Sequence, residues 1–232
     1  WQIWNSQIRY LGVGAMVVGG IWSLLKLMKP LAQGIKASLD AVKHAQSGAA
    51  IRREERDFPI NYVGIGLLAL LVPVFFLYVG VLESASIAAL LSVVMMIFGF
   101  LFSAVAAYMA GVVGSSNNPI SGVTIATILF TALLLLALLG TTSKSGAAGA
   151  ILVGAVVCCA AAIGGDNLQD LKTGHILGAT PWKQQLMQCV GVIAASVVLG
   201  LVLDILHTAY VIGSPTLSAP QATLMKSVAN GV

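Results

Sequence analysis

The chain has 232 residues, of which 58% are hydrophobic and 9% are charged, and its formal net charge is +4. A soluble domain carries about 25% charged residues, so this composition excludes a soluble globular protein and makes the lipid bilayer the solvent for most of the surface. The basic residues lie between apolar segments, which argues against a nucleic-acid-binding surface and favours a role in membrane topology.

Six apolar stretches are long enough to cross a membrane, because a membrane-spanning helix needs about 20 apolar residues. We therefore predict an all-α fold, a polytopic transmembrane helix bundle with broken or re-entrant helix junctions. The predicted spans are 7–28, 59–82, 86–113, 119–140, 147–164 and 186–207. The chain starts at Trp1 without a methionine and stops at Val232. We expect 1–232 to be a single transmembrane domain, the central part of a longer protein.

The Lys and Arg residues are unevenly shared between the two sides of this bundle. If the first span ends in the cytoplasm, nine of the 12 basic residues face the cytoplasm, in the segments 26–56 and 165–185. The positive-inside rule favours this orientation. Residues 31–50 have apolar side chains at helical spacing, which predicts an amphipathic helix at the membrane surface. The run Arg52–Asp57 mixes both charge signs and is interpreted as a solvated linker.

The span at 147–164 carries small residues at every fourth position. They are Gly146, Ala150, Gly154, Cys158 and Ala162. Such a stripe lets another helix approach closely, so we expect protein rather than lipid to enclose this helix. The three cysteines, Cys158, Cys159 and Cys189, have no metal-binding spacing and are interpreted as small apolar packing residues.

The first polar interruption of the apolar text is 114–122. Asn118 followed by Pro119 is typical of a helix start, with Asn as the cap and Pro at the first helical position. The free N–H groups of a helix start attract carboxylates and other anions. The candidate substrate-binding residues here are Ser115, Ser116, Asn117 and Asn118. The alternative is an ordinary tight turn between antiparallel helices at the membrane surface.

The second polar interruption is 164–175. Asp166 followed by Gln169 resembles a capping box for a short helix, and Gly174 is the predicted end of that helix. Charged groups between two spans are candidates for binding a cation, a proton or a zwitterionic substrate. Gln169 and Lys172 are candidate substrate-binding residues, and Asp166, Asp170 and His175 are candidate proton- or cation-coupling residues. The alternative is a solvated cytoplasmic loop whose charges cap helices. Thr180 and Pro181 predict the start of the last helix by the same cap-and-proline pattern.

These segments resemble a known family. The strings Tyr108–Gly111, Gly114–Gly122, Gly165–His175 and Leu177–Pro181, together with Gln7–Ala15 and Ala219–Met225, are similar to the oligopeptide transporter family. The similarity is strongest to its bacterial branch, which is similar to the yellow stripe-like metal-chelate transporters. The family pattern often has His where this chain has Asn117, so this position offers no titratable group here.

The resemblance implies secondary active, proton-coupled transport of small oligopeptides or peptide-like metal chelates across the cell membrane. The implied partners are the substrate, protons, membrane lipid and the remaining helices of a longer transporter, with no cofactor. The sequence has no HExxH, GxSxG or phosphate-loop motif, so we expect no enzyme activity. Two alternatives stay open. One is a membrane-embedded metal-dependent enzyme with Asp166, Asp170 and His175 as ligands, and the other is a channel or scaffold bundle.

Overall fold

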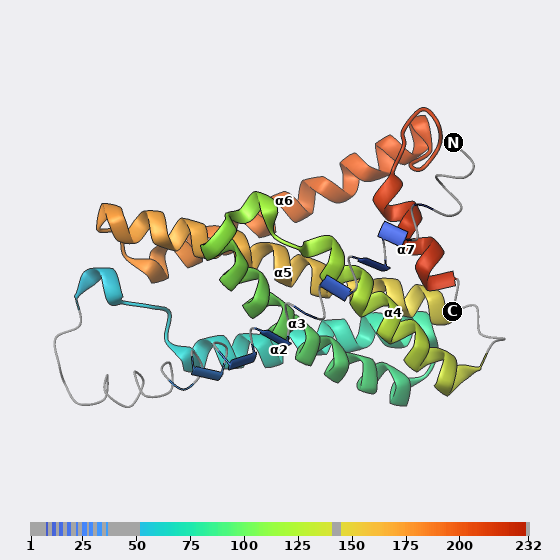
Figure 1. Cartoon of the computed structure of the whole chain (residues 1–232), viewed down its shortest axis with the longest axis horizontal. Coiled ribbons are helices and arrows are strands. Elements are labelled where there is room, and N and C mark those ends of the chain that lie inside the picture. The colour runs from blue at the N-terminus through green and yellow to red at the C-terminus, as the bar shows by residue number, and fades with distance from the viewer. Residues whose placement is uncertain are drawn as a thin grey trace.

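The computed structural model describes residues 52–140 and 145–230, together with scattered positions between 8 and 36. From residue 52 onward the described regular elements are helices, of which two are short 3-10 helices, here called η2 and η3. Figure 1 shows how the helices are arranged. They are η2 (Arg53–Glu55), α2 (Ile60–Leu82), α3 (Ala85–Val113), η3 (Ser115–Asn117), α4 (Ile120–Leu139), α5 (Ser145–Leu177), α6 (Pro181–Tyr210) and α7 (Pro220–Asn230). The five helices α2 to α6 are long and apolar enough to cross a membrane.

The predicted all-α transmembrane fold is therefore confirmed. The helices α2, α3 and α4 begin and end within one residue of the spans predicted at 59–82, 86–113 and 119–140. The span predicted at 7–28 and the surface helix predicted at 31–50 fall mostly outside the described residues.

The predicted second interruption is wrong, because α5 continues without a break from Ser145 to Leu177. Asp166 and Gln169 thus lie inside a helix and form no capping box. The glycines there serve close packing instead. A Cβ added at Gly164 would lie 2.5 Å from Ser103 Oγ of α3, and one added at Gly165 would lie 2.5 Å from Asn118 Nδ2.

The end of α5 also differs from the prediction. The helix passes through Gly174 and ends at Leu177, directly before Gly178, which has a positive backbone φ of +73°. Gly174 is buried because Gln184 of α6 occupies the space that a Cβ would need. The start of α6 at Pro181, with Thr180 at the N-cap, is as predicted from the cap-and-proline pattern, although the predicted membrane span began only at 186.

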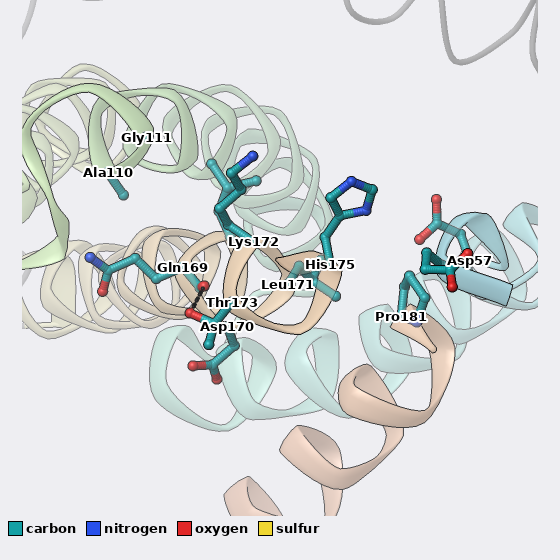
Figure 2. Close-up of a pocket in the computed structure, with 12 residues that line it drawn as sticks. Asp57, Ala110, Gly111, Gln169, Asp170, Leu171, Lys172, Thr173, His175 and Pro181 are labelled. Carbon is teal, nitrogen blue, oxygen red and sulfur yellow. Dashed lines mark hydrogen bonds between the residues drawn. The ribbon is translucent and has the colours of Figure 1, made fainter. Parts of the chain in front are cut away.

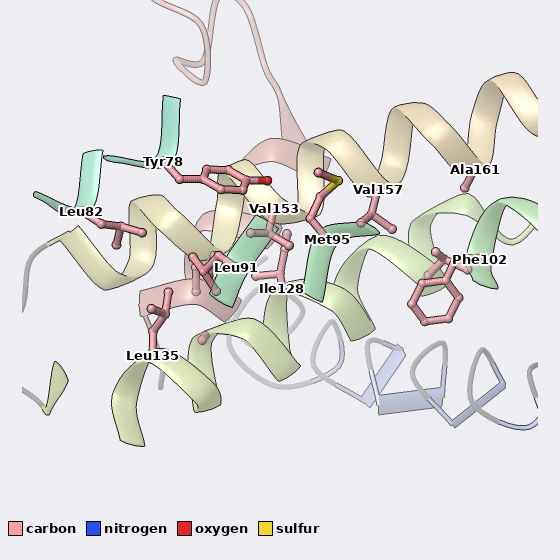
Figure 3. Packing of buried hydrophobic residues seen from close by; sticks show 14 of the residues in the cluster. Tyr78, Leu82, Leu91, Met95, Phe102, Ile128, Leu135, Val153, Val157 and Ala161 are labelled. Atoms are coloured by element: carbon pink, nitrogen blue, oxygen red, sulfur yellow. The ribbon is translucent and has the colours of Figure 1, made fainter. Parts of the chain in front are cut away.

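Helix α5 is the centre of the bundle and packs against α2, α3, α4, α6 and α7. Its buried residues Val153, Val157 and Ala161 recur every fourth position and therefore share one face. Figure 3 shows this face among apolar side chains of α2, α3 and α4. These include Tyr78, Leu82, Leu91, Met95, Phe102, Ile128 and Leu135.

The close helix approach predicted from the small-residue stripe is confirmed at Gly154. Ile128 of α4 fills the space that a Cβ on Gly154 would need, and Gly149 lies against Leu82 and Leu135. The partners along α5 also fix the directions of its neighbours. Ser103 faces Gly164 and Gly111 faces Leu168, so α3 runs parallel to α5. Leu135, Ile128 and Asn118 face progressively later glycines, so α4 runs antiparallel.

Helix α6 diverges from the bundle after its first turns (Figure 1). Pro181 is the one residue of α6 that the described chain buries. The rest of this apolar helix is left for lipid or further protein to cover, because an apolar helix of this length needs a nonpolar surrounding. Helix α7 returns to pack against α4 and α5.

Candidate functional site

The junction between α3 and α4 is the one predicted interruption that the structure contains. Helix α3 ends at Val113, Gly114 takes a backbone φ of +85°, and η3 covers Ser115–Asn117. Helix α4 then starts at Ile120 with Pro119 at its N-cap. The prediction that Asn118 caps α4 is wrong, since no side chain caps this helix. Only the Asn118 backbone carbonyl takes part, accepting a 2.8 Å hydrogen bond from the Ile120 N–H.

The Asn118 side chain points toward α5 and lies against Gly165. Both of its amide atoms, Oδ1 and Nδ2, are buried and have no hydrogen-bond partner among the described residues. An unsatisfied buried polar group costs about 1–3 kcal/mol, so the fold keeps this amide in an unfavourable state. The Asn118 side chain is therefore packed against α5 without a hydrogen bond from the described residues.

We expect the junction to lie near one face of the membrane rather than at its centre. The 20 residues of α4 cover about 30 Å at 1.5 Å per residue, which equals the thickness of the hydrocarbon core. If α4 spans this core, Asn118 marks one of its boundaries. Because Asn118 faces Gly165, the last three turns of α5 extend past this boundary. By the distribution of Lys and Arg, this end is predicted to face the cytoplasm.

A cavity of about 830 Å³ lies at this end, within the roughly 300–1,000 Å³ of small-molecule sites. Figure 2 shows residues that line it, from the end of α3, the last turns of α5, the start of α6 and the segment before α2. They are Glu54, Asp57, Ala110, Gly111, Leu168, Gln169, Asp170, Leu171, Lys172, Thr173, His175 and Pro181. The cavity therefore combines acidic, basic and amide groups, and its lining residues come from three helices and the linker before α2.

Four of the predicted site residues line this cavity: Gln169, Asp170, Lys172 and His175. Asp166, Ser115, Ser116 and Asn118 are not among its lining residues, and the side chain of Asn117 lies outside the described part of the chain. The two predicted groups are neighbours all the same. A Cβ added at Gly114 of the junction would lie 3.9 Å from Gln169 Nε2.

Asp170 connects α5 to α6. Its Oδ2 atom accepts a 2.6 Å hydrogen bond from Gln188 Nε2, and its backbone carbonyl accepts a 3.1 Å hydrogen bond from Gln184 Nε2. Figure 2 shows the Asp170 carboxylate on the opposite side of α5 from Lys172 and His175. On α5, the Asp170 carboxylate is therefore bonded to Gln188 of α6 on one side, while Lys172 and His175 lie on the other side.

The segment 52–57 was predicted to be a solvated linker, and this interpretation is incomplete. The Arg53 guanidinium donates two hydrogen bonds to the Gly178 carbonyl, one of them 3.1 Å long from Nε. The Trp182 N–H donates a 3.2 Å hydrogen bond to the Arg56 carbonyl. These contacts fix the linker to the turn between α5 and α6, and Glu54 and Asp57 line the cavity as a result. The positive-inside rule placed the linker and the turn between α5 and α6 on the same side of the membrane, but it does not predict that they touch.

The remaining acidic residue of the linker points elsewhere. Glu55 forms an exposed ion pair with Arg52, with 2.8 Å between Oε1 and Nη2. The hydrogen bond and the charge of Glu55, together with the charge of Glu54, raise the pKa of the Arg52 guanidinium. Glu55 does not line the cavity, which makes it a natural control for its neighbours.

We expect Arg53→Gln to free the linker without unfolding the bundle. Its hydrogen bonds to Gly178 are exposed, and a typical hydrogen bond contributes about 0.5–1.5 kcal/mol. Hydrogen–deuterium exchange of the amides at 54–57 should become faster, while exchange in α5 stays unchanged. Arg52→Gln is the control, since the Arg52 side chain donates its hydrogen bond to Glu55 within the linker. Equal exchange in both variants would contradict the assigned anchor.

The metal-enzyme alternative finds no support in the described part of the chain. There, no group of three or more His, Cys, Asp or Glu side chains is close enough to hold a metal ion. Asp166, Asp170 and His175 therefore do not form a ligand set in this conformation.

Comparison with known proteins places the chain in a family. The family model described as OPT oligopeptide transporter protein matches residues 1–232. A curated relative from Haemophilus influenzae, named "Putative oligopeptide transporter", is 34% identical over 255 residues, which cover 99% of this chain and 40% of the relative. The chain thus spans less than half the length of that relative. No solved structure matches. The match over all residues, together with the apolar helices, shows a multi-pass protein of the cell membrane that belongs to the OPT oligopeptide transporter family.

Proposed function

We propose that this chain forms part of a secondary active transporter of small oligopeptides, coupled to protons, and that the cavity at the end of α5 holds the peptide. Family membership supports oligopeptide transport. The observation that carries the site is the cavity of about 830 Å³, which has both charge signs on its wall. A short peptide is a zwitterion, so it needs opposite charges at its two ends. The remaining helices of the full-length protein would complete the path.

On the α5 wall, Lys172 and His175 bind the C-terminal carboxylate of the peptide, and Gln169 hydrogen-bonds a backbone amide. Charged hydrogen bonds of this kind are about twice as strong as neutral ones, which suits Lys172 to this role. The junction residues Ser115, Ser116, Asn117 and Asn118 form a second contact, deeper in the protein. The unpartnered amide of Asn118 would gain its missing hydrogen bonds from the peptide when α5 moves away from the junction and Gly165 no longer covers this side chain.

Proton coupling is assigned to Asp166, Asp170 and His175, the titratable groups of the last turns of α5. Protonation of Asp170 removes the charge that strengthens its hydrogen bond with Gln188. The contact between α5 and α6 then weakens, and the two helices separate more easily. A protonophore should abolish peptide accumulation, while Asp170→Asn should leave peptide exchange that no longer depends on a proton gradient.

The test is uptake of labelled di- to tetrapeptides into proteoliposomes that contain the full-length protein and carry a pH gradient. The double substitution Asn118→Ala with Asp170→Ala should reduce uptake by about tenfold or more. Asn118→Ala removes the proposed hydrogen bond to the peptide and Asp170→Ala removes the hydrogen bond to Gln188, each worth about 1 kcal/mol. Glu83→Gln, in the exposed turn that ends α2 at the other end of the bundle, is the control. Unchanged uptake in the double variant would contradict these roles.

The same assay separates the remaining alternatives. Peptide-like metal chelates are the second substrate class, favoured by the resemblance to metal-chelate transporters, and they would be taken up only as the metal complex. A conductance that does not saturate with peptide would favour a channel. Both names found by comparison describe transporters, which speaks against an enzyme.

A further inference from the structure

Two carboxylates of the cavity have no role in the function proposed so far. Glu54 and Asp57 come from the segment before α2 and line the same cavity as Lys172 and His175 of α5. Glu54 is half-buried and Asp57 is exposed. In the described part of this segment, the ion pair joins Arg52 to Glu55. Glu54 lies near enough to Arg52 for its charge to help raise the pKa of that guanidinium.

Each of these carboxylates directly follows a residue that is anchored to the turn between α5 and α6. The Arg53 guanidinium, before Glu54, donates to the Gly178 carbonyl, and the Arg56 backbone carbonyl, before Asp57, accepts a hydrogen bond from the Trp182 N–H. A Cβ added at Gly178 would lie 3.8 Å from Glu54 Oε1, so this carboxylate rests against the turn between α5 and α6. Fixed carboxylates lose less side-chain entropy on binding a ligand than freely moving ones.

The cavity wall carries both charge signs. The linker contributes the carboxylates of Glu54 and Asp57, and α5 contributes the ammonium group of Lys172 beside His175. Asp170 of α5 also lines the cavity, and its carboxylate accepts a hydrogen bond from Gln188 of α6. A ligand that bridges these elements must carry a positive group at one end and a negative group at the other. A peptide with free termini meets this requirement, because its α-ammonium group is positive and its carboxylate is negative at neutral pH.

We propose that Glu54 and Asp57 bind the α-ammonium group of the peptide and thereby select substrates with a free amino terminus. This inference rests on the proposed transport function and deepens it. In this proposal, two residues of the linker that the sequence analysis interpreted as solvated determine substrate specificity. The proposal also orients the peptide, with its amino terminus at the linker and its carboxylate at α5.

The experiment compares Ala-Ala-Ala with N-acetyl-Ala-Ala-Ala as substrates of the full-length protein in proteoliposomes. Acetylation removes the positive charge and leaves the rest of the peptide unchanged. The wild type should have about a tenfold lower KM for the free peptide, since ion pairs in partly exposed sites contribute modestly. Glu54→Gln with Asp57→Asn should raise the KM for the free peptide to that of the acetylated one, and leave the latter unchanged.

The matched control is Glu55→Gln, which removes the neighbouring carboxylate that pairs with Arg52 and does not line the cavity. It should retain the wild-type preference, and Glu54→Asp with Asp57→Glu should retain part of it. The acetylated peptide is measured on each variant, so a folding defect is recognised as a loss of transport for both substrates. A variant with such a loss is then tested by its size-exclusion profile and by peptide binding in detergent.

The outcomes separate the two proposals. If the wild type transports both peptides equally, or if the Glu54 and Asp57 variant keeps the wild-type preference, the ammonium site is wrong while peptide transport stands. If the wild type transports neither peptide, both proposals fail. An effect of Glu55→Gln as large as that of the double variant would also overturn the inference, because it would show a general effect of negative charge.

Discussion

Replacing Gly154 with Ala is expected to destabilise the bundle by about 1–3 kcal/mol, the usual cost of overpacking a close-packed core. Ile128 of α4 already occupies the space that the new Cβ would need, and its nearest atom is Cγ1 rather than the flexible end of the side chain. Ile128 is fully buried and has little room to move. Thermal unfolding of the chain in detergent measures the effect.

Two further variants make this prediction specific. Gly99 is also a buried glycine of a spanning helix, but a Cβ added there would meet nothing within 4 Å. Gly99→Ala should therefore be neutral or stabilising, because Ala has a higher helix propensity than Gly. Combining Gly154→Ala with Ile128→Ala should cost less than the sum of the two single changes. Strict additivity would mean that α4 and α5 do not meet at this point.

Reversing the charge of Lys172 is expected to raise the KM for peptide by about 10- to 100-fold, since a hydrogen bond to a charged group is worth about 1.5–3 kcal/mol. Lys172→Glu removes the proposed partner of the peptide carboxylate and adds repulsion in its place. Initial uptake rates at several peptide concentrations separate KM from the maximal rate.

Lys183→Glu is the control for this change. Lys183 lies at the start of α6, at the same end of the bundle, with its ammonium group 5.7 Å from the centre of the Trp182 ring. It is exposed and does not line the cavity. A general effect of positive charge on peptide attraction would weaken transport equally in both variants. Equal losses would therefore remove Lys172 from the binding site.

The spans α2 to α4 were predictable because apolar length alone determines them. The junction at 114–119 was also predictable, since Gly114 favours the end of one helix and Pro119 favours the start of the next. Gly164 and Gly165 carry the same local signal but serve a different purpose. They lie where Ser103 and Asn118 press against α5, and a single sequence does not distinguish a glycine that ends a helix from one that admits a neighbour.

The candidate site was predictable only in part, for a related reason. The polar residues at the end of α5 interrupt an otherwise apolar sequence, so Gln169, Asp170, Lys172 and His175 were predicted correctly to lie near one another. Glu54 and Asp57 were missed because their contribution depends on contacts with Gly178 and Trp182, which lie more than a hundred residues away in the chain. Charged residues in a linker are usually solvated, and no local pattern marks the ones that are anchored.

The central claim is that the cavity at the end of α5 holds the transported peptide, and substrate protection of a cysteine tests it most directly. In full-length protein without native cysteines, Thr173→Cys places a thiol at the cavity wall and Glu55→Cys places one outside it. We predict that saturating Ala-Ala-Ala slows alkylation severalfold in the first variant and leaves the second unchanged. Equal alkylation rates with and without peptide in the Thr173→Cys variant would contradict the account.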